Sequence, residues 1–249
     1  MIHFLYHLFL RRKGDKSIPV ERWLRWQLYK YLKSGLYNYY KNLNLVKLAK
    51  AEINPKLIVS LTSFPERIQT TYLSIKSILN QTIKPTKVLL WLGEDQFLDK
   101  EDELPLELLN LKKFGLEIFF CEDLKPHTKY YYTFQNYPEY LVVTVDDDIF
   151  YPRDMLETLL KHHAIKPGSI IANRVREILI KDEKIKNYRN WPINMINHSN
   201  PTHNIIATGV GGVLYEPSLI SQRAFDKNKI LELAPKADEV WLKAIELVH

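Results

Sequence analysis

Apolar and polar positions follow two different patterns along this chain, and the pattern changes close to residue 50. Between residues 20 and 43, apolar side chains recur at roughly helical spacing, and most basic side chains lie off that stripe. This pattern predicts an amphipathic helix. The apolar stripe consists of Val20, Leu24, Leu28, Tyr31, Leu32, Tyr39 and Leu43, and the basic residues are Arg22, Arg25, Lys30 and Lys33.

From Pro55 onwards, short apolar runs are separated by stretches of helical periodicity, as expected when strands alternate with helices in an α/β fold. The capping-box spacing of Ser63 and Glu66 predicts that a helix begins there and runs to about Asn80. We expect further helices from near Pro152 and over residues 239–248. The expected strands are Lys56–Leu61, Lys87–Leu92, Leu116–Cys121 and Leu141–Val145.

The change of pattern divides the chain into a basic helical region, residues 1–50, and an α/β domain, residues 51–249. The formal net charge of +6 conceals this division, because residues 1–50 hold 11 Lys/Arg against 2 Asp/Glu and the remainder holds 24 against 27. The first region therefore carries +9 and the second −3. Such a basic segment favours an anionic partner, a membrane surface or a nucleic acid.

Aromatic residues interleave with the basic ones in the predicted N-terminal helix. Trp23, Trp26 and Tyr29 lie among lysines and arginines, a mixture suited to the headgroup layer of an anionic membrane. The alternative is a helix that packs on the domain with its charges in solvent, and the sequence alone does not separate the two. The sequence contains no run of ~18 apolar residues, so no membrane-spanning helix is predicted.

Composition narrows the class of protein without indicating an activity. With 46% hydrophobic, 26% charged and 12% aromatic residues, the chain is expected to fold as a globular protein. Cys121 is the single cysteine, which excludes an intramolecular disulfide and a zinc cluster built from cysteines. A single cysteine also favours a reducing compartment, the cytoplasm.

Three consecutive carboxylates follow the apolar run Leu141–Val145. Like charges this close raise one another's pKa values unless a cation or hydrogen-bond donors neutralise them, and hard oxygen ligands favour Mg2+ or Mn2+. If the strand persists, its alternation puts Asp146 and Asp148 on one side and Asp147 on the other. A helix cap or turn is the alternative, although a cap needs one carboxylate and not three.

The segment from Val145 to Pro152, VDDDIFYP, resembles the Asp-x-Asp segment of GT-A type glycosyltransferases. Five other segments resemble, in the same order, parts of bacterial polysaccharide and lipooligosaccharide transferases of that fold. The resemblance implies a Rossmann-like GT-A fold, a mixed sheet with flanking helices, to which the basic helical arm is attached. The five segments are Leu61–Ile68, Leu79–Thr82, Trp91–Phe97, Gly209–Tyr215 and Ala237–Leu242, within a similarity that covers roughly residues 56–245.

The resemblance implies a nucleotide diphosphate sugar donor, with a UDP-sugar favoured, whose diphosphate is bridged by Mn2+ or Mg2+. Asp148 would hold the metal, and Asp146 would join it through the ribose or a water molecule. Asp147 is expected among the nucleotide contacts. A metal at this point neutralises the charge that develops on the departing nucleoside diphosphate.

Asp238 and Glu239 stand at the expected start of the last helix and resemble the acidic position that acts as base in inverting members of this group. One of them would take the proton of the acceptor hydroxyl, which is a poor nucleophile until a carboxylate accepts that proton. Capping is the alternative for both, because Asp238 suits an N-cap and Glu239 suits the positive end of the helix dipole.

The remaining candidates are contacts to the nucleotide. By the same resemblance, Thr62, Ser63 and Arg67 at the end of the first strand contact the nucleotide, although Ser63 also suits a helix cap. Asp123 and Lys129 follow another strand end, where Lys129 can pair with base, ribose or diphosphate or can remain solvated.

The glycines Gly209, Gly211 and Gly212 allow the backbone to approach a sugar or an acceptor closely, and a chain reversal would need the same residues. We expect a metal-dependent, inverting hexosyltransferase that acts on a bacterial surface glycan, polysaccharide or lipooligosaccharide, with a lipid-linked acceptor. The basic arm would hold the protein at the inner membrane, as a peripheral protein of the cytoplasm.

Two other functions are compatible with the sequence. A sugar nucleotidyltransferase would also use strand-end carboxylates and Mg2+, but it usually has a Gly-rich, basic phosphate loop near its first strand, and none is visible. A non-enzymatic basic module that binds a membrane or nucleic acid would use the arm alone. Recognisable nucleic-acid motifs are absent from the sequence, so no nucleic-acid partner is expected.

Overall fold

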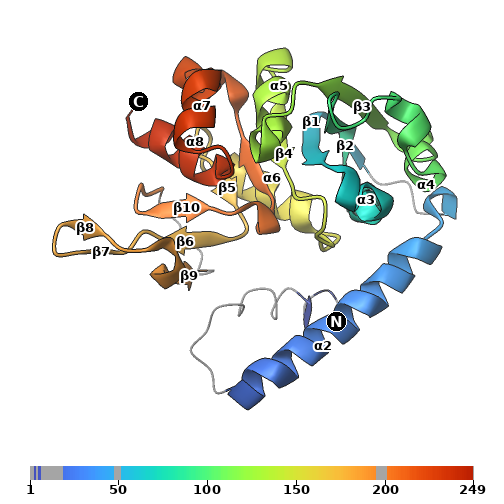
Figure 1. The fold of residues 1–249 in the computed structure, drawn as a ribbon, viewed down its shortest axis with the longest axis horizontal. Helices are drawn as coiled ribbons and strands as arrows, with labels where there is room; N and C mark the ends of the chain where they lie inside the picture. The colour runs from blue at the N-terminus through green and yellow to red at the C-terminus, as the bar shows by residue number, and fades with distance from the viewer. Residues whose placement is uncertain (1–2, 4, 7–18, 48–51, 195–200, 249) are drawn as a thin grey trace.

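The computed structural model of this protein describes residues 3, 5–6, 19–47, 52–194 and 201–248. Among these residues, six strands form a central sheet in the order β3-β2-β1-β4-β11-β5 (Figure 1). The first four run parallel, whereas β11 is antiparallel to both of its neighbours. In that order, the strands are β3 (Leu116–Cys121), β2 (Ile83–Gly93), β1 (Glu52–Ser63), β4 (Leu141–Thr144), β11 (Val213–Tyr215) and β5 (Ile171–Ala172).

Helices cover both faces of this sheet. Successive residues of β1 enter opposite halves of the core: Leu57 and Val59 pack with residues of α3 and α6, whereas Ile58 packs with residues of α5 and α8. A strand buried on both faces is apolar at nearly every position, which explains the unbroken apolar runs in the sequence. The α-helices are α2 (Pro19–Asn42), α3 (Pro65–Leu79), α4 (Leu106–Leu109), α5 (Thr128–Asn136), α6 (Met155–Ile165), α7 (Lys227–Leu233) and α8 (Asp238–Leu247).

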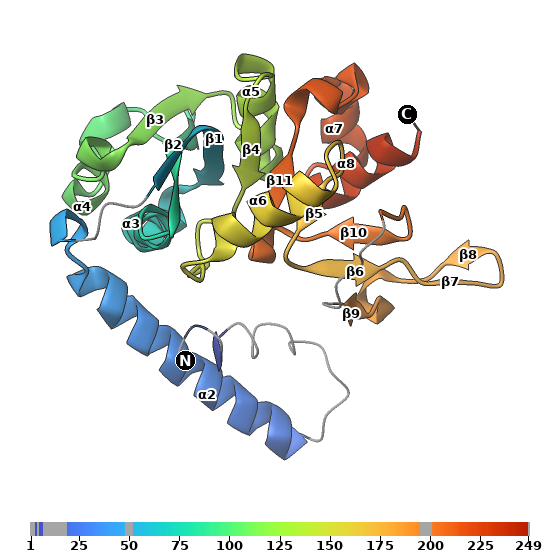
Figure 2. The ribbon, with the colours of Figure 1, turned by 180° about the vertical axis from the view of Figure 1, so that it is seen from behind.

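A second, three-stranded antiparallel sheet and a short hairpin lie beyond the β5 edge of the central sheet (Figure 2). The small sheet consists of β10 (Ile205–Ala207), β6 (Val175–Glu177) and β9 (Ile193–Asn194), and the hairpin of β7 (Ile180–Lys181) and β8 (Lys184–Ile185).

The expected α/β fold class, with a mixed sheet and flanking helices, is confirmed. All four expected strands are present: β3 has the expected bounds, β1 and β2 extend further at both ends, and β4 ends one residue early. The last helix begins at Asp238, so Ala237 and not Asp238 is its N-cap residue.

The capping box expected at Ser63 and Glu66 is not formed. Ser63 is the last residue of β1, α3 begins at Pro65, and Phe64 occupies the N-cap position without a side-chain hydrogen bond. Proline suits the first helical position because its backbone angle is already helical and it has no N–H group to satisfy. The Ser63 hydroxyl therefore remains available for another partner.

The helix expected from near Pro152 begins three residues later, at Met155. Carbonyl groups of the preceding turn are engaged elsewhere: the Gln81 side chain donates to the Pro152 carbonyl over 2.7 Å, and the Thr82 backbone donates to the Arg153 carbonyl over 2.8 Å. The end of α3 thus fixes the turn that leads into α6.

Helix α2 is the expected amphipathic helix, but its apolar residues face two directions. Leu32, Leu36 and Tyr40 are buried and belong to the same apolar cluster as the central sheet. Tyr29 is half-buried against the same cluster. The exposed apolar side chains described on the helix are Trp23, Leu24, Trp26, Leu28, Tyr31, Tyr37 and Tyr39. No helix in the described ranges combines the length and the apolar character needed to cross a membrane.

Substitutions on the two sides of α2 are expected to differ in their effect on stability. Leu36→Ala removes a fully buried side chain and should lower the free energy of unfolding by about 2–5 kcal/mol. Leu28→Ala, on an exposed side of the same helix, should change it by less than about 0.5 kcal/mol. Urea denaturation of both variants measures these values, and equal effects would contradict the described packing.

Candidate active site

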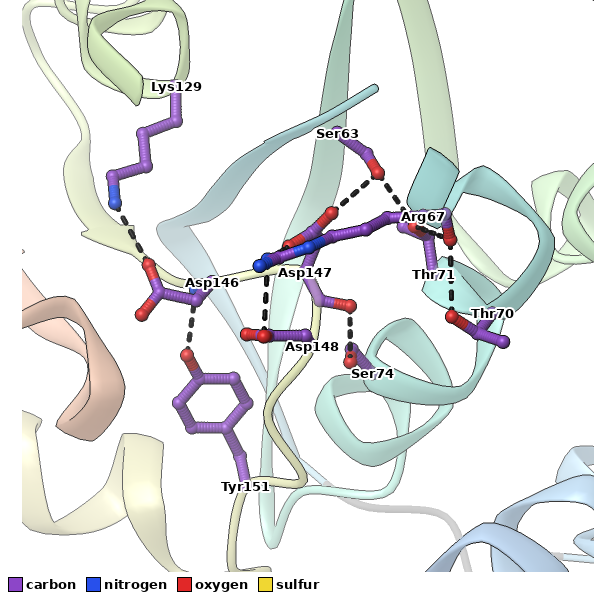
Figure 3. Close-up of polar contacts among 10 residues, drawn as sticks. All are labelled: Ser63, Arg67, Thr70, Thr71, Ser74, Lys129, Asp146, Asp147, Asp148 and Tyr151. Carbon is purple, nitrogen blue, oxygen red and sulfur yellow. Dashed lines mark hydrogen bonds and ion pairs between the residues drawn. The ribbon is translucent and has the colours of Figure 1, made fainter. Parts of the chain in front are cut away.

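The three aspartates lie where the chain leaves β4, at the carboxyl edge of the parallel strands (Figure 3). The Val145 backbone still donates to the Ser60 carbonyl over 3.0 Å, after which the chain turns away from β1. Ligands of open α/β sheets bind outside this edge. The position of the acidic segment is therefore that of a ligand site.

Asp147 is directed into the protein. Its buried carboxylate accepts hydrogen bonds from the Ser63 hydroxyl over 2.6 Å and from the Arg67 guanidinium over 2.7 Å. Its backbone carbonyl accepts from the Ser74 hydroxyl over 2.7 Å. Burial raises the pKa of Asp147, and the hydrogen bonds from Ser63 and Arg67 oppose that shift. These contacts make Asp147 the anchor of the acidic segment.

Asp148 is the most exposed of the three carboxylates, with 41% of its side chain accessible. Arg67 lies 3.2 Å from it and 2.7 Å from Asp147, so one guanidinium joins both carboxylates. The strict alternation expected from a continued strand does not apply here, because β4 ends at Thr144.

Asp146 is tied to a distant part of the chain through Lys129. The Lys129 ammonium lies 3.1 Å from Asp146 and 3.1 Å from Asp238, the first residue of α8. Burial disfavours the charged amine, but the Asp238 and Asp146 carboxylates outweigh burial and raise the pKa of Lys129 well above its usual value. Lys129 is thus a buried cation between two acids rather than a solvated side chain.

Glu239 lies beside this trio and faces the turn before β11. Its carboxylate accepts a hydrogen bond from the Gly209 backbone. Burial, together with the charge of Asp238, raises the pKa of Glu239 from 4.5 to about 7. A carboxyl group with a pKa near 7 is suited to proton transfer at neutral pH.

The glycines of this turn are explained by close approaches of the chain itself. A Cβ on Gly209 would lie 2.6 Å from the Asp146 carboxylate, and one on Gly211 would lie 2.8 Å from the Arg174 backbone nitrogen. Gly212 has a φ of +77°, a conformation that favours glycine, and lies against Met155. Of the three, Gly209 touches the acidic segment.

Thr62 and Asp123 lie on the same sheet edge but have other partners. The Thr62 hydroxyl donates to the Trp91 carbonyl over 2.9 Å. Asp123 accepts from the Gln96 side chain over 2.6 Å and from the Lys125 backbone over 2.7 Å. Asp123 follows β3, which β2 and β1 separate from β4.

Two residues that the sequence did not indicate also hold the acidic segment. Ser74 donates to the Asp147 carbonyl, and the Tyr151 hydroxyl accepts from the Asp146 backbone over 2.8 Å (Figure 3). The same hydroxyl donates to the Gly209 carbonyl over 3.2 Å. Ser74 lies in the middle of a helix and Tyr151 in an apolar run, and neither environment indicates a polar role. Both side chains form hydrogen bonds with backbone atoms. Every residue has these atoms, so the sequence does not indicate where such contacts form.

The donor groups fit a divalent cation that is shared with a ligand. Asp146 and Asp148 are partly exposed carboxylates, and Mg2+ usually takes one or two carboxylates together with phosphate oxygens and water. Within the described part of the chain, no group of three or more His, Cys, Asp or Glu side chains is arranged to hold a metal. Asp146 and Asp148 are therefore the carboxylates of this segment that could hold a cation, and a ligand or water would have to complete its coordination.

No protein-family model and no curated protein sequence matches this chain. A mannosyltransferase from Pyrobaculum calidifontis, in complex with GDP-Man and Mn2+, aligns at 12% identity and a TM-score of 0.38, over 69% of this chain and 47% of its own. This chain thus spans about half the length of that protein.

Two further solved structures align. A 4-diphosphocytidyl-2C-methyl-D-erythritol synthase aligns at 11% identity and a TM-score of 0.41, covering 75% of this chain and 85% of its own. A CMP:2-keto-3-deoxy-manno-octonic acid synthetase complexed with CTP aligns at 11% identity and a TM-score of 0.42, covering 80% and 84%. Similarity at this level assigns no activity, ligand or metal to this chain.

The raised pKa of Glu239 predicts a pH-dependent effect of Glu239→Gln on stability. Between pH 4.5 and about 7 the folded protein keeps a proton that the unfolded chain has lost, so wild-type stability falls as pH rises through this range. Glutamine keeps an acceptor for Gly209 but does not titrate. At pH 8 the variant should therefore be more stable than wild type by roughly 1–3 kcal/mol, and this difference should shrink towards pH 4.

Urea denaturation at pH 4, 6 and 8 measures this difference. Glu232→Gln, at an exposed position of α7, is the matched control and should show no such trend. A Glu239→Gln variant whose stability relative to wild type does not change with pH would contradict the raised pKa.

Proposed function

We propose that this protein is a metal-dependent glycosyltransferase that moves a hexose from a nucleotide diphosphate sugar to a bacterial surface glycan. A UDP-sugar is the favoured donor and Mn2+ or Mg2+ the metal. The observation that supports this most directly is the position of Lys129, 3.1 Å from both Asp146 and Asp238. Asp146, which we assign to the cation, thereby lies beside the start of α8, where the next residue after Asp238 is the proposed base, Glu239.

In this proposal the charged side chains that surround the ligand are already in position in the protein alone. Asp146 and Asp148 hold the cation, which when bound supplies positive charge to the diphosphate oxygens of the donor. Lys129 and Arg67 compensate the carboxylates from the protein side, so that the segment keeps its shape without a ligand. Asp147 keeps the segment on α3 and has no role in the chemistry.

Glu239 is the proposed base. The acceptor oxygen attacks the anomeric carbon, the bond from that carbon to the diphosphate breaks, and the hydroxyl proton passes to the Glu239 carboxylate. The Gly209 N–H group orients this carboxylate, and burial together with the charge of Asp238 raises its pKa towards neutrality. Attack opposite the leaving group inverts the configuration of the sugar. Asp238 is the weaker candidate, because it is buried against Lys129.

A donor panel tests this proposal by the release of nucleoside diphosphate, with and without Mn2+. Asp148→Asn and Glu239→Gln should each lower kcat by about 10²–10⁴-fold, because each removes a charge that acts in the transition state. Asp182→Asn, an exposed aspartate in the β7–β8 turn, is the matched control and should retain full activity.

Three results would count against this assignment. Turnover that does not need a metal, or full activity in Asp148→Asn, would exclude the mechanism. The same panel with CTP or UTP and sugar phosphates detects pyrophosphate release, which would instead indicate a nucleotidyltransferase.

We further propose that the protein acts at an anionic membrane surface, as a peripheral protein with a lipid-linked acceptor. Apart from the buried stripe, α2 exposes two strips of side chains. At helical spacing, Leu24, Leu28, Tyr31 and Tyr39 form an apolar strip. The aromatic and basic strip consists of the exposed Trp23, Trp26, Lys30, Tyr37 and Lys41 and the half-buried Lys33. An exposed apolar surface of this kind on a soluble protein usually binds a partner.

The chemistry of these strips suits lipid headgroups. The Lys30 ammonium lies 3.3 Å from the centre of the Trp26 ring, which combines a cation with an interfacial aromatic group. Residues 1–50 have a net charge of +9, which attracts an anionic leaflet. Nucleic acid is not the expected partner, because the exposed strip on the other side of α2 is apolar.

Sedimentation with phosphatidylglycerol-containing vesicles tests the membrane proposal. Lys30→Gln combined with Lys33→Gln should weaken binding roughly 30-fold, since each basic residue contributes about 1 kcal/mol near an anionic surface. Lys181→Gln combined with Lys184→Gln removes the same charge from the exposed hairpin and should have little effect. Equal losses in both double variants, or binding that is insensitive to salt, would exclude α2 as the contact surface.

A further inference from the structure

The C-terminal end of α2 packs against the acidic segment. Tyr40 is fully buried and stacks on Phe150, with ring centroids 5.3 Å apart and planes 10° apart. Phe150 follows Asp148 by two residues and is itself buried. Helix α2, which the sequence predicts as a separate arm, therefore packs its Tyr40 ring against the residues that follow the three aspartates.

The next residue, Tyr151, transmits this contact to the acids. The Tyr40 hydroxyl lies 3.5 Å from the Tyr151 carbonyl, and the Tyr151 backbone donates to the Ser77 hydroxyl over 3.0 Å. The Tyr151 hydroxyl accepts from the Asp146 backbone (Figure 3) and also donates to the Gly209 carbonyl. The hydrogen bond between the Asp146 backbone and the Tyr151 hydroxyl thus closes residues 146–151 into a loop. Tyr40 packs against this loop through the Phe150 ring.

The end of α2 is itself held in place from α3. The Lys76 ammonium donates to the carbonyls of Tyr40, Lys41 and Leu43 over 3.0, 3.1 and 3.1 Å. Helix ends carry carbonyl groups without partners and a partial negative charge, and a lysine here satisfies both. The same helix α3 donates from Ser74 to the Asp147 carbonyl. One rigid helix therefore sets the position of α2 relative to the acids.

We propose that Tyr40 is a positioning residue for the acidic segment, so that α2 determines whether Asp146 and Asp148 can share a divalent cation. The inference rests on the proposed metal role of these two carboxylates. Tyr40 does not touch a substrate or the cation. It acts through Phe150 and Tyr151, which fix the backbone on which the two carboxylates are mounted.

The test compares Mn2+ affinity with stability in the full-length protein. Free Mn2+ is titrated by electron paramagnetic resonance in the presence of UDP, for wild type, Tyr40→Ala, Tyr40→Phe and Asn38→Ala, each below its melting temperature. Tyr40→Ala should weaken Mn2+ binding about 10–100-fold, the usual effect of losing a group that orients metal ligands. Tyr40→Phe keeps the ring and should restore binding to near wild type. Asn38→Ala changes an exposed position of α2 outside both surface strips and should not change Mn2+ binding.

The possible results separate this inference from the proposed function. Wild type that does not bind Mn2+ would overturn the metal role and the inference with it. Mn2+ binding that is equal in folded Tyr40→Ala and in wild type would overturn the positioning role alone. If Tyr40→Ala does not fold, Phe150→Leu keeps an apolar side chain but removes the stacked ring, and the same loss of affinity is expected.

Discussion

The candidate site depends on the ion pairs that the buried Lys129 ammonium group makes with Asp146 and Asp238. Asp146 follows β4 and Asp238 begins α8, and the two carboxylates would repel each other without a cation between them. Removing one partner of a buried ion pair commonly costs about 3–5 kcal/mol, because the other charge is left without compensation. In this protein the loss would also remove the link between Asp146 and Asp238, so the same contact contributes to stability and holds the candidate site together.

The fold could be predicted in outline because its inner strands are buried on both faces. Such strands give continuous apolar runs, as in β4, whose predicted bounds are correct to within one residue. Ser63 shows where this kind of reasoning fails. Its spacing to Glu66 is that of a capping box, yet its hydroxyl donates to Asp147 on a neighbouring strand end, and local sequence contains no record of that neighbour.

The acidic residues of the site were also predictable, since three carboxylates after an apolar strand are unusual in any protein. Their partners were less so. Lys129 was expected as a ligand contact or a solvated side chain, and it is a buried bridge between two acids. Spacing alone does not show which apolar side chains of α2 face the core and which face outward, because both groups lie on one helix. Burial separates them: Leu32, Leu36 and Tyr40 face the core, and Leu24 and Leu28 face outward.

The antiparallel pairing of β11 with β4 determines how the two halves of the site meet. Val213 is paired with Thr144, so the chain that enters β11 runs backwards alongside the chain that leaves β4. Gly209 is therefore opposite the acidic segment, with Asp146 on one side and Glu239 on the other. The separation between Asp146 and Glu239 is thus set by strand register, and we expect any change of length within residues 209–212 to alter it. The β7–β8 hairpin, which pairs only with itself, can accept insertions without altering that separation.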